Sequence, residues 1–329
     1  MQTRHLNAPG PMPGILAAVL ALTALTAGAQ GFPAKPVRVI VPFPPGGADV
    51  TLRLVQPAWQ EELGQPVVIE NRAGANGIIG TDYMTKQPAD GYTLLWTASN
   101  PIVTGPVTTP RETTYDAANG ITHVSKLLSG VVTIAVPSSL PVGTMREFID
   151  YAKRNPGKLS FASVGIGSSQ HIDGEILKLR AGIDMVHVPY KGFGQVLPDL
   201  VAGRVQLAFI AYLSAVQQLN AGKLKLLAVT TRPYARLPGM PVVDELVPGF
   251  ERLPVWSASV HAPPGLPRPV LGRIHGSLMK ILTGTELRRK FEEDGYIVTA
   301  NSPEEFAAEV RDSLEKTASL IKLTGLQLQ

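Results

Sequence analysis

Short apolar strands alternate with helical segments through most of this chain, and no other feature constrains its fold as strongly. The alternation begins with an apolar strand at 37–41, a helical segment near 49–63, a strand at 67–69 and a helical segment at 78–86. Strands that alternate with helices predict parallel α/β layers. Gly64 fits the glycine that often ends a helix and supports the boundary placed there.

The alternation restarts after residue 130. Thr144 and Glu147 have the spacing of a capping box for a helix that runs to about Asn155. Later segments continue the pattern, with strands at 159–161, 185–188, 205–209 and 224–229 and helices at 168–181 and 195–202. The restart predicts a second α/β lobe, as expected for a chain of this length.

The last third is mostly helical. An apolar strand at 256–260 precedes helical segments at 270–283 and 286–294, and Ser302 and Glu305 fit the start of a final amphipathic helix. These helices have few strands of their own to cover. We therefore expect them to pack back on the first lobe.

The first thirty residues have the pattern of a secretory signal peptide. Arg4 precedes the apolar run 15–25, and Ala27-Gly28-Ala29 fits a cleavage site. The apolar run is about half of the roughly twenty residues that a membrane-spanning helix needs. We therefore expect export and cleavage near Ala29, with a permanent N-terminal anchor as the alternative.

Composition narrows the possible functions. The chain has no cysteine, which excludes disulfides, a thiol nucleophile and cysteine-bound zinc. The formal charge is +4, in mixed clusters such as the basic residues 288–290 followed by the acidic residues 292–294. Nucleic-acid binding would need a basic stripe interleaved with aromatic residues. We therefore expect no nucleic-acid partner.

Three loops rich in glycine or serine, at 42–49, 70–78 and 162–169, each follow a strand and precede a helix. In open α/β sheets ligands bind at the carboxyl ends of strands, and helix N-termini favour anions. Because these loops are spread over both expected lobes, they predict one cleft lined by hydrogen-bond donors.

Several of these loop residues also have structural interpretations. Asp49 is a good helix N-cap, as is one of Ser168 and Ser169. The glycines at 74–80 are spaced G-x-x-G-x-x-G, which differs from a dinucleotide-binding loop, so a structural role and an anion-binding role both stay open. A lone histidine such as His171 is typical of a structural role rather than of catalysis.

Catalytic motifs give no support to an enzyme. The sequence contains no G-x-S-x-G elbow, no P-loop and no H-E-x-x-H among its six histidines. We expect a binding protein with no catalytic residue, no bound metal and no cofactor. An enzyme built on a binding-protein scaffold is a further hypothesis, which would convert its ligand instead of returning it intact.

Four segments also occur together in a known family. They are 41–47 (VPFPPGG), 64–72 (GQPVVIENR), 90–95 (DGYTLL) and 186–192 (VHVPYKG). In this order they resemble the tripartite tricarboxylate transporter substrate-binding proteins, also called Bug-type receptors, and the resemblance extends from about residue 32 to 325.

The resemblance implies a type II periplasmic-binding-protein fold, in which two α/β lobes are joined by two crossover segments and enclose a ligand cleft. We place the signal peptide at 1–29, lobe 1 at 32–130 plus 258–329, and lobe 2 at 131–257. Relatives capture di- or tricarboxylates, sometimes acidic amino acids or aromatic acids. The implied function is a monomeric periplasmic receptor that delivers a small carboxylate to a membrane permease. The alternative is a ligand-presenting sensory partner of a membrane signalling protein.

In the family, one carboxylate is held by the first loop and its distal end meets the second lobe. The expected ligand-binding residues are Phe43, Pro44, Pro45, Gly46, Gly47, Asp49, Asn76, Ser99, Ser163, Gly167, Ser168, Ser169, Tyr190 and Lys191. Many relatives have a polar pair after the strand that ends at 207–209, whereas this chain has Ile210-Ala211. This departure argues against recognition of an amino group and favours a more apolar acid.

Overall fold

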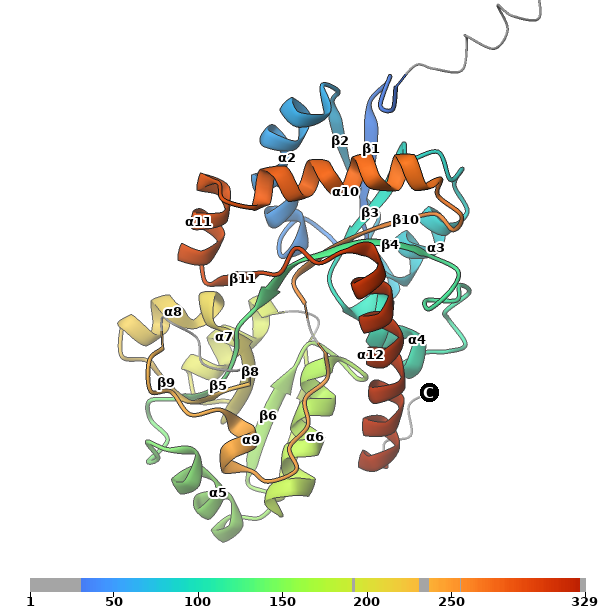
Figure 1. The fold of residues 1–329 in the computed structure, drawn as a ribbon. Helices are drawn as coiled ribbons and strands as arrows, with labels where there is room; N and C mark the ends of the chain where they lie inside the picture. Colours follow the sequence, from blue (N-terminus) through green and yellow to red (C-terminus); the bar gives the residue numbers. More distant parts are fainter. Residues whose placement is uncertain (1–30, 191–192, 231–236, 255, 326–329) are drawn as a thin grey trace, which may run out of the picture.

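A computed structural model of the chain describes residues 31–190, 193–230, 237–254 and 256–325, so the expected signal peptide lies outside the described residues. The described chain forms two α/β lobes, each built on its own sheet, and one lies above the other in Figure 1. None of the described helices combines the length and the hydropathy that a membrane crossing needs.

The first lobe is built on a six-stranded sheet with the strand order β11-β4-β10-β3-β1-β2. Its strands are β1 (Val37–Val41), β2 (Val67–Asn71), β3 (Thr93–Thr97), β4 (Thr122–Gly130), β10 (Ala258–Ala262) and β11 (Tyr296–Val298). β1 pairs in parallel with β2 and β3, whereas β10 is antiparallel to β3 and β4. The helical elements are α2 (Ala48–Leu63), η1 (Ala75–Gly77), α3 (Ile78–Thr85), η2 (Asn100–Thr104), α4 (Gly105–Thr108), α10 (Arg268–Leu282) and α11 (Glu286–Glu293).

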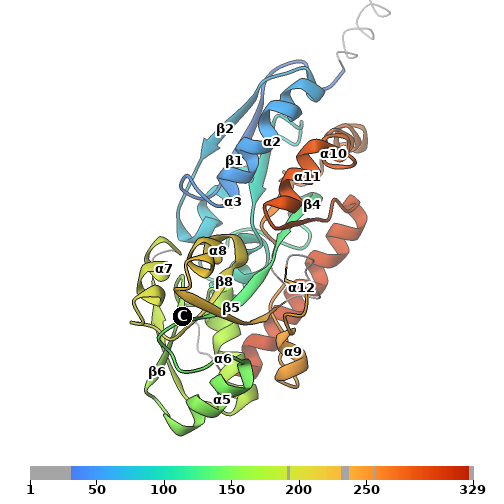
Figure 2. The ribbon, with the colours of Figure 1, turned by 90° about the vertical axis from the view of Figure 1, so that its left-hand side faces the viewer.

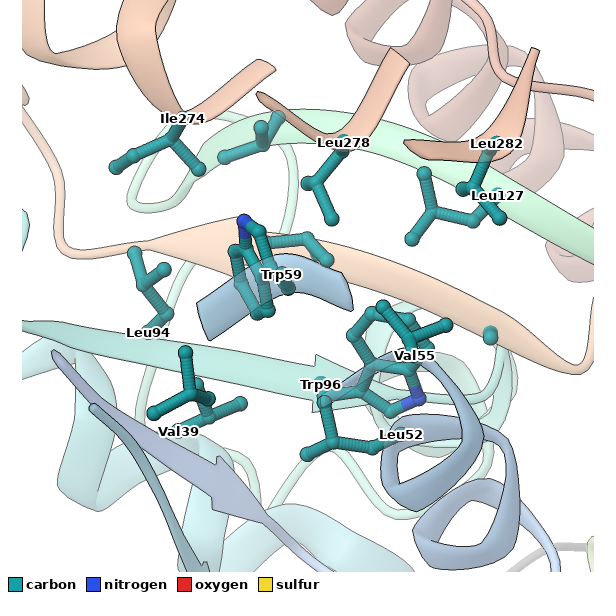
Figure 3. Close-up of a cluster of buried hydrophobic side chains, with 14 of the residues drawn as sticks. Val39, Leu52, Val55, Trp59, Leu94, Trp96, Leu127, Ile274, Leu278 and Leu282 are labelled. Atoms are coloured by element: carbon teal, nitrogen blue, oxygen red, sulfur yellow. The ribbon is translucent and has the colours of Figure 1, made fainter. Parts of the chain in front are cut away.

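A buried cluster holds α2 against the sheet and beside α10 (Figure 3). Trp59 of α2 is fully buried, and its indole Nε1 donates to Ser277 Oγ of α10 at 2.8 Å. Trp96 of β3 is also fully buried and donates to Thr51 Oγ1 at 3.1 Å. Buried tryptophans contribute large apolar areas, and here the N–H of each also has a partner. The loop before α2 is therefore attached to a rigid helix.

The second lobe is built on a five-stranded sheet with the strand order β7-β6-β8-β5-β9. Its strands are β5 (Val132–Pro137), β6 (Leu159–Ser163), β7 (Met185–Pro189), β8 (Leu207–Ala211) and β9 (Leu224–Val229). β6 pairs in parallel with β7 and β8, whereas β5 is antiparallel to β8 and β9. Its helices are α5 (Met145–Arg154), α6 (Ser169–Ala181), α7 (Phe193–Val201), α8 (Tyr212–Asn220) and α9 (Val243–Leu246).

Two segments connect the lobes. β4 ends at Gly130 in the first sheet and β5 begins at Val132 in the second, so one residue separates strands of different lobes. The chain returns through Trp256 and Ser257 before it enters β10 of the first sheet. Ser257 N donates to Leu128 O at 2.8 Å, which places the two connections side by side.

The final helix, α12 (Pro303–Thr324), contacts both lobes. Phe306 and Val310 belong to a buried cluster of the first lobe, whereas Leu320 belongs to the core of the second. Figures 1 and 2 show α12 leaving the first lobe and running beside α6. Packing of the C-terminal helices on the first lobe is confirmed for α10 and α11 but is wrong for the end of α12. A 22-residue helix is about 33 Å long and extends past one lobe.

The structure agrees with most of the predicted boundaries. The capping boxes of α5 at Thr144 and of α12 at Ser302 are both present, and Ser168 is the N-cap of α6. The interpretation of Asp49 as the cap of α2 is wrong. That helix starts one residue earlier, after Gly47, and its cap position has no side-chain hydrogen bond among the described residues.

Candidate functional site

A cavity of about 650 Å³ lies between the two lobes. The first lobe lines it with Phe43, Pro44, Pro45, Gly46, Gly47, Ala48, Thr51, Asn76, Ala98, Ser99 and Asn100. The second lobe lines it with Val164, Ser168, Ser169, Gln170, Gly194, Ala211, Tyr212, Leu213 and Ser214. The connecting segments and β11 complete the wall with Gly130, Val131, Val132, Trp256, Ser257, Gly295 and Tyr296. The volume is typical of small-molecule sites.

The electrostatics of the cavity come from helix ends. The N-termini of α2, α6 and α8 all contribute lining residues, and α2 and α8 have no side-chain cap from the described residues. The first N–H groups of a helix lack intrahelical acceptors, and the helix dipole adds positive potential there. None of the described lining residues is acidic, basic or histidine. The site therefore favours an anion through N–H groups, hydroxyls and amides.

The loop of the first lobe, residues 43–47, is held by the end of β2. Asn71 Nδ2 donates to Phe43 O and to Asp49 Oδ1, both at 3.0 Å. The guanidinium of Arg53 donates to the two carboxylate oxygens of Asp49 at 2.8 and 3.1 Å. This guanidinium is the main cause that holds the pKa of Asp49 below its usual value. A buried, charged carboxylate thus links the loop to α2.

The loop of the second lobe joins β6 to α6. Ser163 Oγ accepts from Gly165 N at 3.1 Å, and Gly167 N donates to His171 Nδ1 at 3.1 Å. Ser168 Oγ donates to the carbonyl of Gly165 at 2.7 Å. The polar groups at the start of this loop and in its middle are therefore used to shape it.

The structure brings most of the sequence-predicted ligand residues to the cavity. Those that line it are Phe43, Pro44, Pro45, Gly46, Gly47, Asn76, Ser99, Ser168 and Ser169. Asn76 is fixed by Asn100, whose Nδ2 donates to the carbonyl of Asn76 at 3.0 Å. Lys191 lies outside the described residues.

Four predicted ligand residues do not line the cavity. Asp49, Ser163 and Gly167 are used in the hydrogen bonds that hold the two loops. The hydroxyl of Tyr190 donates to Asp199 Oδ2 at 2.8 Å, and burial raises the pKa of Tyr190 to about 12. The polar groups of these four residues thus form hydrogen bonds within the protein.

Sequence reasoning missed the wall formed where the lobes join. This wall includes Gly130, Val131, Trp256 and Tyr296. The side chains of the last three are apolar or aromatic, and no sequence motif surrounds them. Sequence reasoning also missed Gln170, whose side-chain oxygen is buried and has no hydrogen-bond partner among the described residues. Its position one residue into α6 could have identified it, because it follows the expected helix start.

The end of β8 differs from the sequence prediction, which ended this strand at residue 209. β8 continues through Ile210 and Ala211, and Ile210 is buried in the core while Ala211 lines the cavity. Ser214 adds a hydroxyl to the same wall. The described residues contain no group of three histidine, aspartate or glutamate side chains placed to hold a metal ion.

Comparisons with known proteins agree with this architecture. The family model described as "Tripartite tricarboxylate transporter family receptor" matches residues 51–326. Protein BugT of Bordetella pertussis is 32% identical, with 95% of this chain and 98% of BugT covered. A solved structure of Rhodopseudomonas palustris Rpa4515 with adipate is 31% identical, covers 89% of this chain and 98% of that chain, and has a TM-score of 0.80.

A second solved structure, MatC of Rhodopseudomonas palustris with bound malate, is 26% identical with a TM-score of 0.76, and covers 88% of this chain and all of MatC. The expected two-lobed periplasmic-binding-protein fold is therefore confirmed, as is the expectation of a binding protein, because the family consists of solute receptors that catalyse no reaction. The chain belongs to the tripartite tricarboxylate transporter receptor family, the Bug-type periplasmic solute-binding proteins.

Proposed function

We propose that this receptor captures a small carboxylate in the periplasm and delivers it to the membrane permease of a tripartite tricarboxylate transporter. The observation that carries the proposal is the meeting of three helix N-termini, from α2, α6 and α8, at one cavity whose described lining residues include no charged side chain. Such a site binds a carboxylate through directed N–H and O–H donors.

The nine predicted residues that line the cavity are the proposed ligand contacts. Gly46 and Gly47 present backbone groups at the start of α2, while Ser169 presents its hydroxyl and N–H group at the start of α6. One carboxylate is proposed to bind the first-lobe loop. The rest of the ligand reaches the second lobe, where Ala211 and Leu213 offer an apolar surface.

Closure of the lobes completes capture. The cavity is shared by both lobes, and the two connecting segments are short, so rotation of one lobe on the other would change the distance between the helix N-termini. A ligand that bridges them stabilises the closed form by its extra contacts there. The closed form is the one proposed to dock on the permease.

The ligands of two relatives support the chemical class. The Rpa4515 structure contains adipate and the MatC structure contains malate. The two acids differ in length and in hydroxyl content, but both carry two carboxylates. We infer that this chain also binds a carboxylate, with the identity of the acid set by the second-lobe wall.

A screen by thermal shift tests ligand capture directly. The exported protein is heated with dicarboxylates, tricarboxylates, aromatic acids and acidic amino acids, and the recovered ligand is identified by mass spectrometry. An acid at a hundred times its dissociation constant should stabilise the protein by about 2.7 kcal/mol. The proposal fails if no acid shifts the transition, or if the acid is recovered chemically altered.

A pair of variants tests whether the ligand is an anion. Ala211→Glu places a carboxylate at the N-cap of α8, where it favours the helix but repels an anion in the cavity. We expect the affinity for the carboxylate to fall at least about tenfold, because two negative charges in one cavity repel each other strongly. Ala211→Gln has the same size and no charge, so it should bind at least several-fold better than the glutamate variant. Equal affinities would contradict anion binding.

Two further measurements test export and delivery. N-terminal sequencing of the periplasmic protein should give a start at Gln30, after cleavage next to Ala29. Uptake of the identified acid by cells should stop when the receptor is deleted and return when it is restored. Ligand-dependent recovery of a membrane signalling protein instead of permease subunits would favour the sensory alternative.

A further inference from the structure

Two histidines hold the cleft loop of the second lobe in shape. We call residues 163–169 the serine loop. Val164, Ser168 and Ser169 of this loop line the cavity. The effect of the loop on a ligand therefore rests on the proposed function, whereas its attachment to the histidines does not.

Ring nitrogens of both histidines take part in the attachment. His171 Nδ1 accepts the N–H of Gly167 at 3.1 Å, which requires that this nitrogen carry no proton. His187, in the neighbouring strand β7, places Nε2 2.6 Å from Ser163 Oγ. Ser163 Oγ in turn accepts the N–H of Gly165 at 3.1 Å. The serine loop is thus tied to a ring at its start and again near its end.

The two rings stack on each other. Their centroids are 3.8 Å apart and their planes differ by 12°. Phe161 stacks on His187 with centroids 5.0 Å apart. Burial disfavours a charge on either ring, and a charge on His171 further disfavours one on His187. Burial lowers the pKa of His187 to about 4 and also lowers that of His171.

The charged groups around the rings leave this balance in place. On α6, Glu175 raises the pKa of His171 and Lys178 lowers the pKa of both rings, and the two side chains pair at 2.9 Å. Asp173, also on α6, pairs with Arg252 at 3.3 Å. The pair formed by Glu175 and Lys178 has little net charge, so burial decides.

The other elements packed on α6 add little charge near the rings. β6 and β8 contain no titratable residue, and β7 contributes only His187. From residue 311 onward α12 carries Arg311, Asp312, Glu315, Lys316 and Lys322, and Lys316 Nζ lies 3.9 Å from Glu251 Oε2. The unprotonated state of the two rings therefore follows mainly from their burial.

We propose that His171 and His187 are positioning residues for the serine loop, and that acid releases the loop from its ligand-binding conformation. At neutral pH the bare Nδ1 of His171 accepts the N–H of Gly167. A proton on that nitrogen turns the acceptor into a donor, so two N–H groups then face each other. The charged ring also repels a second proton on His187. The receptor holds its ligand at neutral pH and loosens it in acid.

Amide hydrogen exchange of the ligand-free protein tests the proposal before the bound carboxylate is identified. Amide hydrogen exchange of residues 163–169, corrected for the intrinsic effect of pH, is compared at about pH 7.5 and about pH 5. We expect protection of these amides to fall about tenfold in acid, while amides of β6 keep theirs. Protection that is independent of pH would overturn the proposal.

Matched variants identify the responsible rings. His171→Asn and His187→Gln place amide groups near the positions of Nδ1 and Nε2, and neither amide titrates. The double variant should keep its protection in acid, whereas His275→Asn, which changes a histidine of α10, should behave like the wild type. An acid-induced loss in the double variant equal to that of the wild type would contradict the proposal.

Two further measurements distinguish the role of the histidines from the proposed capture of a carboxylate. Two-bond 1H–15N correlation in the wild type reports the tautomer of His171 and needs no variant to fold. A proton on Nδ1 at about pH 7.5 would exclude the proposed hydrogen bond. Affinity for the acid found by thermal shift should then fall in acid for the wild type more than for the double variant. Absence of any binding acid would defeat the proposed function, while exchange and tautomer would still decide the role of the histidines.

Discussion

The two loops that face each other across the cleft occupy equivalent places in their lobes but are held by different chemistry. Each follows a strand, β1 or β6, and precedes a helix, α2 or α6. In both lobes the parallel neighbour strand supplies the anchor, Asn71 of β2 in the first lobe and His187 of β7 in the second. The first anchor is an amide joined to an ion pair. The second is an imidazole joined to a second imidazole.

Because of this difference, we expect the shape of the first-lobe loop, residues 43–47, to be insensitive to pH and that of the serine loop to be sensitive to it. We call these loops the constant wall and the adjustable wall. The amide of Asn71 does not titrate, and Asp49 stays charged because Arg53 lowers its pKa. The first-lobe loop should keep its shape over the whole range in which the protein is folded. Histidine is the side chain whose charge changes nearest to neutral pH. The second-lobe loop is therefore the one whose shape should depend on conditions.

The largest effects should come from removing the close helix–strand approach behind each loop. A Cβ at Gly174 of α6 would lie 2.1 Å from Phe161, the ring on which His187 stacks. A Cβ at Gly80 of α3 would lie 2.6 Å from the carbonyl of Arg72 and 2.8 Å from Pro42. Each glycine-to-alanine change should reduce stability by about 1–3 kcal/mol in urea unfolding, because overpacking outweighs the better helix propensity.

A matched glycine provides the control. Gly276 of α10 has open space around its Cβ direction, so Gly276→Ala should leave stability unchanged or raise it by up to about 1 kcal/mol. Gly174→Ala should also weaken the serine loop, since it displaces Phe161, whereas Gly80→Ala should leave that loop intact. Equal exchange of the serine loop in both variants would break the comparison between the lobes.

Changes at the anchors themselves should affect ligand affinity. Asn71→Ala removes the donors to Phe43 O and to Asp49, and leaves a buried carboxylate with one partner fewer. Such losses reduce the free energy of unfolding by about 1–3 kcal/mol. Because binding must then order the released loop, we expect ligand affinity to fall about tenfold at every pH, measured by calorimetry. Ser163→Ala removes one hydroxyl from the second loop and should cost about threefold, for the smaller loss of a neutral hydrogen bond.

Acid should also destabilise the protein as a whole, through both pairs of histidines. In the first lobe His123 and His261 place their Nδ1 atoms 2.9 Å apart, and burial lowers the pKa of His123 to about 4. An unfolded chain binds these protons at about pH 6.5. Stability is therefore fully present above about pH 6.5 and falls as the pH approaches about 4, because the unfolded state binds more protons.

One substitution in the first pair separates stability from loop shape. His123→Asn removes a titrating ring and keeps a polar group near Nδ1. The loss of stability between about pH 6.5 and about pH 4 should shrink by up to about 3 kcal/mol, the value of a pKa shift of this size. Exchange of the serine loop should still respond to acid. A lost response would show that the acid effect is global instead of local.

The alternation of strands and helices and its restart after residue 130 could be predicted from the sequence, but the direct passage from one strand to another at that restart could not. β1, β9 and the caps at Thr144 and Ser302 follow from local patterns of apolar residues and hydroxyls. The direct passage from β4 to β5 has no helix or long loop to reveal it, because a single residue, Val131, separates the two strands. The second half of α12 is amphipathic in either case, and only the tertiary structure shows that Leu320 packs in the second lobe.

The candidate site likewise has a part that could be predicted from the sequence and a part that could not. The loops that present backbone groups were predictable, because glycine, serine and proline between a strand and a helix have few other uses. Asp49 and Ser163 are polar and lie in those segments, and Tyr190 follows β7, yet the polar atoms of all three bond to the protein. Conversely, Val131 and Trp256 line the cavity through their position where the lobes join. The sequence indicates where a strand ends and a loop begins, but it does not indicate the direction in which a side chain points.

The smallest expected effect concerns the ion pair that assists the constant wall. Arg53 is half exposed, while its partner Asp49 is buried and also bonded by Asn71. Exposed ion pairs contribute little, so Arg53→Ala should change ligand affinity by no more than about twofold at neutral pH. Because Arg53 is the main cause of the lowered pKa of Asp49, the variant should lose affinity at a higher pH than the wild type as acid is added. Binding of the same carboxylate to both proteins, followed from neutral pH to below about pH 5, measures this difference. Arg53→Lys should restore only part of the wild-type profile, because lysine cannot make the two-point contact of the guanidinium. An unchanged profile in Arg53→Ala would mean that Asn71 alone keeps Asp49 charged, which would make the first wall still less dependent on pH than the second.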